Sequence, residues 1–123
     1  MATIADRILD NGLTVLDTEA TRVDILSQES TTYAEATSTH TLGNSTSVTI
    51  SAPADRTGGG RKVTMSAISD GTVTGTGTAT HYSLTDTNNS RLLVTGSLTA
   101  SQSVTSGNTF SLEALDVGIP DPS

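Results

Sequence analysis

Short runs of the chain alternate aliphatic and polar residues, and Ser or Thr occupies most of the polar positions. In TSVTISA, residues 46–52, the aliphatic side chains fall on one face and the hydroxyl side chains on the other. KVTMSA, residues 62–67, repeats this pattern. Alternation with a period of two in a β-branched background is typical of half-buried antiparallel strands. We therefore expect an all-β fold, an antiparallel β-sandwich or jelly-roll-like domain.

About nine strand-like runs are separated by turn residues. Residues 46–52 and 61–68 form a hairpin-like pair around a loop with three consecutive glycines. Glycines within residues 69–86 indicate bulges or the close approach of another backbone. Residues 87–90 and 106–108 are the expected turns before the last strands. Ten side chains share the inward parity of their runs and form the expected core: Val48, Ile50, Val63, Met65, Tyr82, Leu84, Leu92, Val94, Phe110 and Leu112.

The N-terminal segment supports two interpretations. Residues 3–9 and 13–17 flank an Asn-Gly pair within residues 10–12, and Asn-Gly between alternating runs favours a tight hairpin. A short helix over residues 3–10 stays open as the alternative, because two isoleucines lie one turn apart and a glycine follows. We favour the hairpin. Residues 22–28 are the next expected strand, and residues 33–42 are a weaker, poorly phased one.

The last apolar run, residues 109–119, changes parity partway along its length. A change of parity turns side chains to the other face unless a bulge absorbs it, so we expect a bulge or strand break at Ala114–Leu115. Pro120 and Pro122 should end the sheet and begin an extended tail. The expected organisation is a single β domain over residues 1–123, with an N-terminal hairpin or arm (1–20), a sandwich (21–114) and a C-terminal strand and tail (115–123).

The apolar content is low for a domain of this size. Leu, Ile, Val and Phe number 26 of 123 residues, and the chain has no Trp, one Phe and two Tyr. Because aromatic side chains supply much of the buried area in many cores, an isolated monomer would have a thin core. We therefore expect a homo-oligomer, with a trimer as the first candidate, or a monomer that becomes rigid on a host surface.

The net charge, the lack of long apolar runs and the lack of cysteine limit which binding partners and which cellular compartment we expect. The net charge of −7 opposes binding to phosphate backbones, so we expect no nucleic-acid partner. The sequence has no apolar run near 18 residues, and its start lacks the features of a signal peptide, so we expect no membrane partner. The absence of cysteine fits synthesis in a reducing cytosol.

Candidate chemistry is sparse. His40 and His81 are the only imidazoles, and a metal site would need a third ligand such as Glu35 or Asp86. The segment GGGRK, residues 58–62, lacks the spacing of a phosphate-binding loop. No Gly-x-Ser-x-Gly sequence is present to expose a nucleophile. We expect no catalytic residue, no metal and no cofactor, and hence no enzyme.

An asymmetry of charge indicates a contact surface instead. Three of the six basic residues cluster around the glycine loop, whereas acidic residues concentrate near the N-terminus. This distribution would suit head-to-tail contact between copies. The candidate contact residues are Arg56, Arg61, Lys62, Asp6, Asp10, Asp17 and Glu19.

Four segments carry a resemblance to known proteins: IADRILDNGLTVLDTEA, TTYAEATSTHTLGN, APADRTGGGRKVTMSAISDG and GTATHYSLTDTNNSRLLVTGSLTASQSVTSGNTFSLEALDVGIPDP. Together they resemble small virion proteins of tailed bacteriophages, which are often encoded beside the major capsid protein or assigned to head decoration. THYSLTD followed by SRLLVTGSLTASQSVTSGNTFSL is also similar to a β-rich module of phage tail-fibre-like proteins.

The resemblance implies a virion structural role. Because the acidic N-terminal third is not shared with the tail-fibre-like module, we expect a capsid decoration or cement protein. Its partners would be the major capsid protein and other copies of itself, and its location the capsid surface. A tail, neck or fibre component, a carbohydrate- or receptor-binding module, and a hydrolase are the alternatives. Only Tyr33, Tyr82 and Phe110 could supply rings to a sugar-binding groove.

Overall fold

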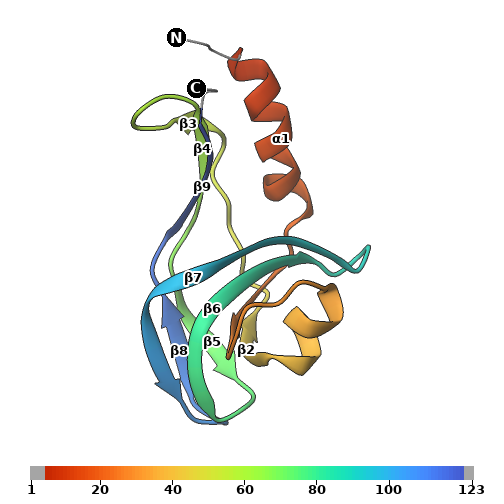
Figure 1. Cartoon of the computed structure of the whole chain (residues 1–123), viewed down its shortest axis with the longest axis vertical. Helices are drawn as coiled ribbons and strands as arrows, with labels where there is room; N and C mark the ends of the chain where they lie inside the picture. The colour runs from red at the N-terminus through yellow and green to blue at the C-terminus, as the bar shows by residue number, and fades with distance from the viewer. Residues whose placement is uncertain (1–4, 121–123) are drawn as a thin grey trace. The chain divides into compact units, whose positions relative to one another are not determined.

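A computed structural model describes residues 5–120 of the chain and shows a mostly β protein (Figure 1). Strands make up 50% of the residues and helix 17%, and all strand pairs are antiparallel, so the expected all-β, sandwich-like fold is confirmed. The chain divides into two compact units. We call them the helical unit (Met1–Glu19, Thr49–Ala67 and Glu113–Ser123) and the curled-sheet unit (Ala20–Val48 and Ile68–Leu112).

The curled-sheet unit is one six-stranded sheet whose two ends approach each other (Figure 1). Its strand order is β7-β6-β1-β2-β5-β8, although β7 and β8 follow each other in the chain through a tight turn. The Gln102 side chain of β7 donates to the Ser111 carbonyl of β8 at 3.1 Å, which bridges the seam. The strands are β1 (Arg22–Leu26), β2 (Thr41–Ser45), β5 (Ile68–Val73), β6 (Gly77–Asp86), β7 (Arg91–Val104) and β8 (Thr109–Leu112).

Strand β1 lies in the middle of this sheet and is buried on both faces. It lies within the strand expected at residues 22–28, and Val23, Ile25 and Leu26 are equally buried. β1 pairs with β2 on one side and with β6 on the other, with Val23 opposite Leu84. Pairing on both sides satisfies the backbone of β1, and its side chains are buried because both faces of the strand are covered.

The helical unit packs one helix on a small sheet of order β3-β4-β9. Leu9, Leu13 and Leu16 of the helix are buried, and their spacing of four and three residues places them on one helical face. Gly12 lies on the flank nearest β9, because a Cβ there would meet Ile119 Cδ1 at 3.6 Å. The elements are α1 (Asp6–Glu19), β3 (Ala54–Asp55), β4 (Arg61–Met65) and β9 (Leu115–Ile119).

The preferred N-terminal hairpin is therefore wrong for the described residues. Helix α1 runs through the Asn11-Gly12 pair without a turn. The three leucines at helical spacing bury a continuous stripe, whereas the strand interpretation would have split them between two faces. The helix is longer than the alternative considered over residues 3–10, and residues 3 and 4 lie outside the described residues.

The weak strand expected at residues 33–42 is also wrong. Glu35–Thr39 form a short helical turn, η1, and β2 begins only at Thr41. Thr32 Oγ1 accepts from the Glu35 amide at 3.1 Å, while the Glu35 carboxylate accepts from the Thr31 amide at 2.8 Å. These reciprocal bonds resemble a capping box, which holds the first amides of a helical turn.

The parity change in residues 109–119 is a strand break, as expected. Strand β8 ends at Leu112 and pairs with β5, whereas β9 begins at Leu115 and pairs with β4. The hairpin expected from residues 46–52 is only partly formed, since Ile50 makes an isolated bridge to Met65 and β3 continues the pairing. Pro120 follows β9, and Pro122 lies outside the described residues.

Half of the expected core is fully buried. Val63, Met65, Leu84, Phe110 and Leu112 are buried as predicted. The other five are only half-buried: Val48 and Ile50 lie outside the named strands, Leu92 and Val94 lie on edge strand β7, and Tyr82 is half-buried although it pairs with Ile25 and Gly96. Gly71 lies at an irregularity in the pairing of β5 with β8, as expected for a bulge, and an added Cβ there would overlap the Phe110 ring.

We predict that Gly71→Ala destabilises the protein by about 1–3 kcal/mol, the usual cost of overpacking a filled core. The matched control is Gly75→Ala, because a Cβ there would meet its nearest atom at an ordinary 3.5 Å. Denaturant unfolding followed by circular dichroism measures both variants. Equal stabilities for the two variants would show that the Phe110 ring does not constrain position 71.

Candidate functional site

Arg61 at the start of β4 organises the charged side of the helical unit. Its Nε donates to Asp10 Oδ1 of α1 at 2.8 Å, and its Nη1 donates to Asp55 Oδ1 of β3 at 2.7 Å. Nη2 also donates to the Pro53 carbonyl at 3.3 Å. Arg61 and Asp10 were both expected on a contact surface between copies. In one chain they already bind each other and attach the helix to the sheet.

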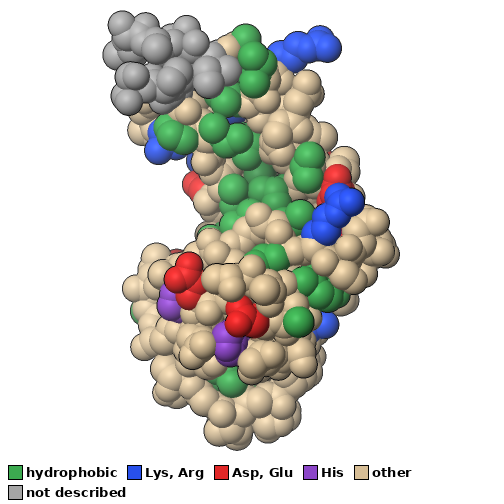
Figure 2. Space-filling view, turned by 45° about the vertical axis from the view of Figure 1, so that its right-hand side comes forward, with side chains coloured by type: hydrophobic (Ala, Val, Ile, Leu, Met, Phe, Trp, Pro, Cys, Tyr) green, Lys and Arg blue, Asp and Glu red, His purple; other side chains and the backbone are tan. Residues whose placement is uncertain are grey.

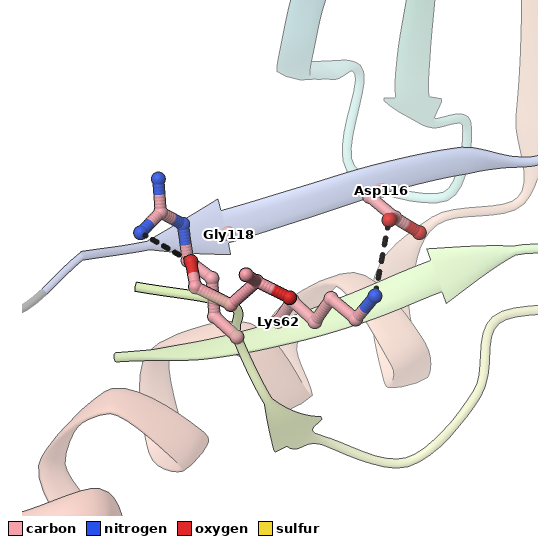
Figure 3. Close-up of a pocket in the computed structure, with 5 residues that line it drawn as sticks. Lys62, Asp116 and Gly118 are labelled. Atoms are coloured by element: carbon pink, nitrogen blue, oxygen red, sulfur yellow. Dashed lines mark hydrogen bonds and ion pairs between the residues drawn. The ribbon is translucent and has the colours of Figure 1, made fainter. Parts of the chain in front are cut away.

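Beside this cluster lies an open pocket of about 340 Å³ on the polar face of the small sheet (Figure 3). Lys62 of β4 and Asp116 of β9 are joined across the strands, with Nζ and Oδ2 3.1 Å apart. Gly118 lies opposite Lys62, and its missing side chain leaves room for the Arg56 stem, whose Cδ is 3.0 Å from where a Cβ would be. Thr57 completes the lining.

The pocket carries a surplus of positive charge. The Thr64 hydroxyl, 2.7 Å from Asp116 Oδ1, and the Lys62 ammonium hold the pKa of Asp116 below its ordinary value, so this carboxylate is ionised at neutral pH. Arg56 donates to the Thr57 and Gly59 carbonyls, and among the described residues it makes no ion pair with a carboxylate. Two cations against one carboxylate can attract an anionic group such as a carboxylate.

The other predicted contact residues lie apart from this pocket. Asp17 is exposed on α1, and Glu19 is half-buried at the end of that helix. The side chain of Asp6 is outside what the structure describes. Of the seven candidates, the structure thus brings together Arg61 with Asp10, and Arg56 with Lys62.

The two histidines are separate, and each lies beside an acidic side chain on the surface (Figure 2), while their side-chain hydrogen bonds are to neutral groups. His40 lies 3.0 Å from Ser30 Oγ through Nδ1 and 2.8 Å from Gln28 through Nε2. His81 Nδ1 lies 2.8 Å from Thr80 Oγ1. Within residues 5–120, no group of three His, Cys, Asp or Glu side chains is placed to hold a metal ion.

The curled-sheet unit contains a buried ion pair that was not predicted from the sequence. Asp24 is 0% exposed and accepts from Arg22 Nε at 2.7 Å and Nη2 at 2.8 Å. Thr41 donates its hydroxyl to the same carboxylate at 2.6 Å, and Arg22 reaches the Thr37 carbonyl at 3.3 Å. A buried charge can mark a functional site, but this one is fully satisfied by its neighbours and joins β1, β2 and η1. The signal in the sequence was an Arg and an Asp two apart on one strand face.

Asp86 stabilises the turn between β6 and β7. It accepts from the Asn89 side chain at 2.8 Å and from the amides of Asn88 and Asn89 at 3.0 and 3.3 Å. The Asn89 side chain is the largest cause of a pKa of Asp86 below its ordinary value, followed by the two amides. Aspartate is common in turns for this reason, and here it is structural.

Edge strand β7 presents a second candidate surface. Leu92, Leu93, Val94 and Leu98 are partly exposed along this strand, with Val94 on the face of Leu84 and Leu92 on the face of Thr85, and we call these four residues the β7 strip. The pairing of β7 with β6 is irregular at Leu93 and again over residues 98–101. Bulges of this kind prevent regular strand addition, so contacts at the β7 strip would be made by side chains.

Comparisons with protein-family models, curated proteins and solved structures gave no match. Among the helices that the structure describes, none is long and apolar enough to cross a membrane.

We predict that Asp24→Asn lowers the free energy of unfolding by about 2–4 kcal/mol, because it leaves a largely buried guanidinium without its countercharge. Asp55→Asn is the control, since it removes an equally short Arg contact, at 2.7 Å, from a side chain that is 90% exposed. Exposed pairs contribute about 0–1 kcal/mol. Urea denaturation distinguishes the two, and a cost for Asp55→Asn equal to that for Asp24→Asn would contradict the prediction.

Asp86 generates a pH prediction. Its pKa is lower in the folded than in the unfolded chain, so its contribution is present above the unfolded value, about 3.9, and is lost as pH falls toward the folded value. Asp86→Asn should therefore lower the melting temperature at pH 7. The difference in melting temperature between Asp86→Asn and the unmodified protein should shrink as the pH falls below about 3.9. A difference in melting temperature that stays constant from pH 7 to pH 3 would contradict a stabilising role for the ionised Asp86 carboxylate.

Proposed function

We propose that the chain is a virion structural protein of a tailed bacteriophage, a capsid decoration protein that binds the major capsid protein on the outer surface of the head. It would be made in the host cytoplasm and would need no cofactor. The resemblance of four segments to small phage virion proteins supports this role. The structural observation that carries the proposal is the β7 strip, a row of partly exposed aliphatic side chains along an edge strand of the curled-sheet unit.

The surface of the curled-sheet unit fits attachment better than chemistry. Figure 2 shows that uncharged polar side chains and backbone cover most of its visible face. Partly exposed aliphatic side chains grouped along an edge strand in such a setting favour contact with another protein. Within residues 5–120, the carboxylates whose pKa is lowered accept hydrogen bonds from residues of their own turn or of the paired strand, as Asp86 and Asp116 do. These hydrogen bonds are structural.

A tail or fibre component is the second candidate, and one observation favours it. The segment similar to the tail-fibre-like module, Thr80–Leu112, coincides with most of β6 and all of β7 and β8. A carbohydrate-binding role has less support, because Phe110 is buried and the Tyr82 ring lies against Gly96. Only Tyr33 is then left among the three rings considered for a sugar platform.

The proposal is tested by quantitative mass spectrometry of purified particles from the phage or prophage that encodes the chain, with heads and tails separated. We expect the chain in the head fraction, at a copy number proportional to that of the major capsid protein. Recovery in tails would favour the second candidate. Absence from both fractions would overturn the virion role.

A binding experiment locates the surface. Leu98→Asp places a charge in the β7 strip and should abolish co-sedimentation of the purified protein with empty capsids. Thr99→Asp is the matched control, because it introduces the same charge at the neighbouring exposed position and should bind normally. Circular dichroism confirms that both variants are folded. Normal binding by Leu98→Asp would exclude the β7 strip as the attachment surface.

A further inference from the structure

Strand β9 is a free and regular sheet edge. It pairs with β4 along all five residues without a bulge, and within the described chain no strand lies on its other side. The opposite edge of this sheet, β3, is only two residues long. A regular edge without a bulge, an internal proline or a lysine is a template for another strand. Of the edges in the helical unit, β9 is therefore the one suited to pairing.

Exposed apolar side chains of α1 lie on the same side as this edge. Ile8 is 65% exposed and Val15 is 40% exposed. Positions 8, 12 and 15 form one stripe along a helix, and Gly12 of that stripe faces Ile119 of β9. Asp10, on another side of the helix, binds Arg61 of β4. Ile8 and Val15 thus flank β9, where a neighbouring copy could cover them.

We infer that a second copy of this chain pairs antiparallel with β9 about a two-fold axis at Val117. In that register Val117 lies opposite the Val117 of the second copy, and Leu115 lies opposite its Ile119. These side chains share the face that α1 covers, so each apolar side chain of β9 packs beside an apolar side chain of the second copy. On the other face, Asp116 lies opposite Gly118 of the second copy, so no like charges oppose each other.

In this dimer the polar pocket of each copy faces the Asp116 carboxylate of the second copy. The stem of Arg56 lies across Gly118 of its own chain, with Nε 3.2 Å from where a Cβ would be. The Asp116 that faces this glycine belongs to the second copy, which brings its carboxylate to the guanidinium of Arg56. Each of the two symmetric pockets receives one carboxylate in this way. Each Asp116 then lies between Lys62 of its own chain, with Nζ 3.1 Å from Oδ2, and Arg56 of the second copy.

The dimensions of the joined sheet also allow the two helices to pack. Neighbouring strands are about 4.8 Å apart, so two helices that each lie over β4 and β9 would have axes about 10 Å apart. Packed helices are separated by about 8–10 Å. Strand pairing therefore brings the exposed flanks of the two helices together. A two-fold contact closes as a dimer, so this inference replaces the trimer expected from the sequence.

The test uses the purified full chain, so its outcome is independent of the virion experiment. Sedimentation equilibrium should give twice the 12.6 kDa mass of one chain. Arg56→Glu places like charges opposite each other and should raise the dimer dissociation constant by about tenfold or more. Arg7→Glu, the same charge change at an exposed position of α1, should leave it unchanged. A monomer at every accessible concentration, or equal effects of the two variants, would overturn the inference.

Cross-linking fixes the register independently. The chain has no cysteine, so single cysteines report one contact each. Val117→Cys should form a disulfide-linked dimer under mild oxidation, because the two positions face each other at the axis. Ala54→Cys on β3 is the control at the opposite edge and should stay monomeric on a denaturing gel. No cross-link at position 117 in a protein that sediments as a dimer would overturn this register.

Discussion

The direction of side chains along a strand is the constraint on which this structure depends. Successive residues point to opposite faces, so a strand that buries one face must keep its apolar residues at one parity. The chain keeps this rule within β8 and within β9, and breaks it between them. The two residues at 113–114 therefore release the backbone from one sheet, and β9 joins β4 in another. Both the small sheet and its free edge result from that change.

Parity also explains how much of the fold the sequence predicted. Most of the strands, the turns at residues 87–90 and 106–108, the break before Leu115 and the irregularity at Gly71 follow from local rules, whereas the strand expected at residues 33–42 did not form. Helix α1 was missed because Asn11-Gly12 carries a strong turn signal. The leucines at positions 9, 13 and 16 carried the opposite signal, and tertiary burial of their stripe decided the outcome.

The candidate site was less predictable because long-range pairing assembles it. Arg56 and Lys62 were identified from their clustering near the glycines, but Asp116 and Gly118 come from a strand more than fifty residues later. No periodicity within either strand shows which residue will lie opposite which. The clamp between Arg61 and Asp10 depends in the same way on a helix that had been interpreted as a hairpin.

The order of segments in the helical unit has a consequence for how the chain acquires its structure. The unit is assembled from the first, middle and last parts of the sequence, whereas the curled-sheet unit is complete once Leu112 has been made. During synthesis β4 must wait for β9, which follows the whole curled-sheet unit in the sequence. Contacts of such long sequence separation close slowly, because the loop between them must first lose its entropy. The curled-sheet unit can therefore fold first, and α1 and β4 find their final partners only after β9 has been made.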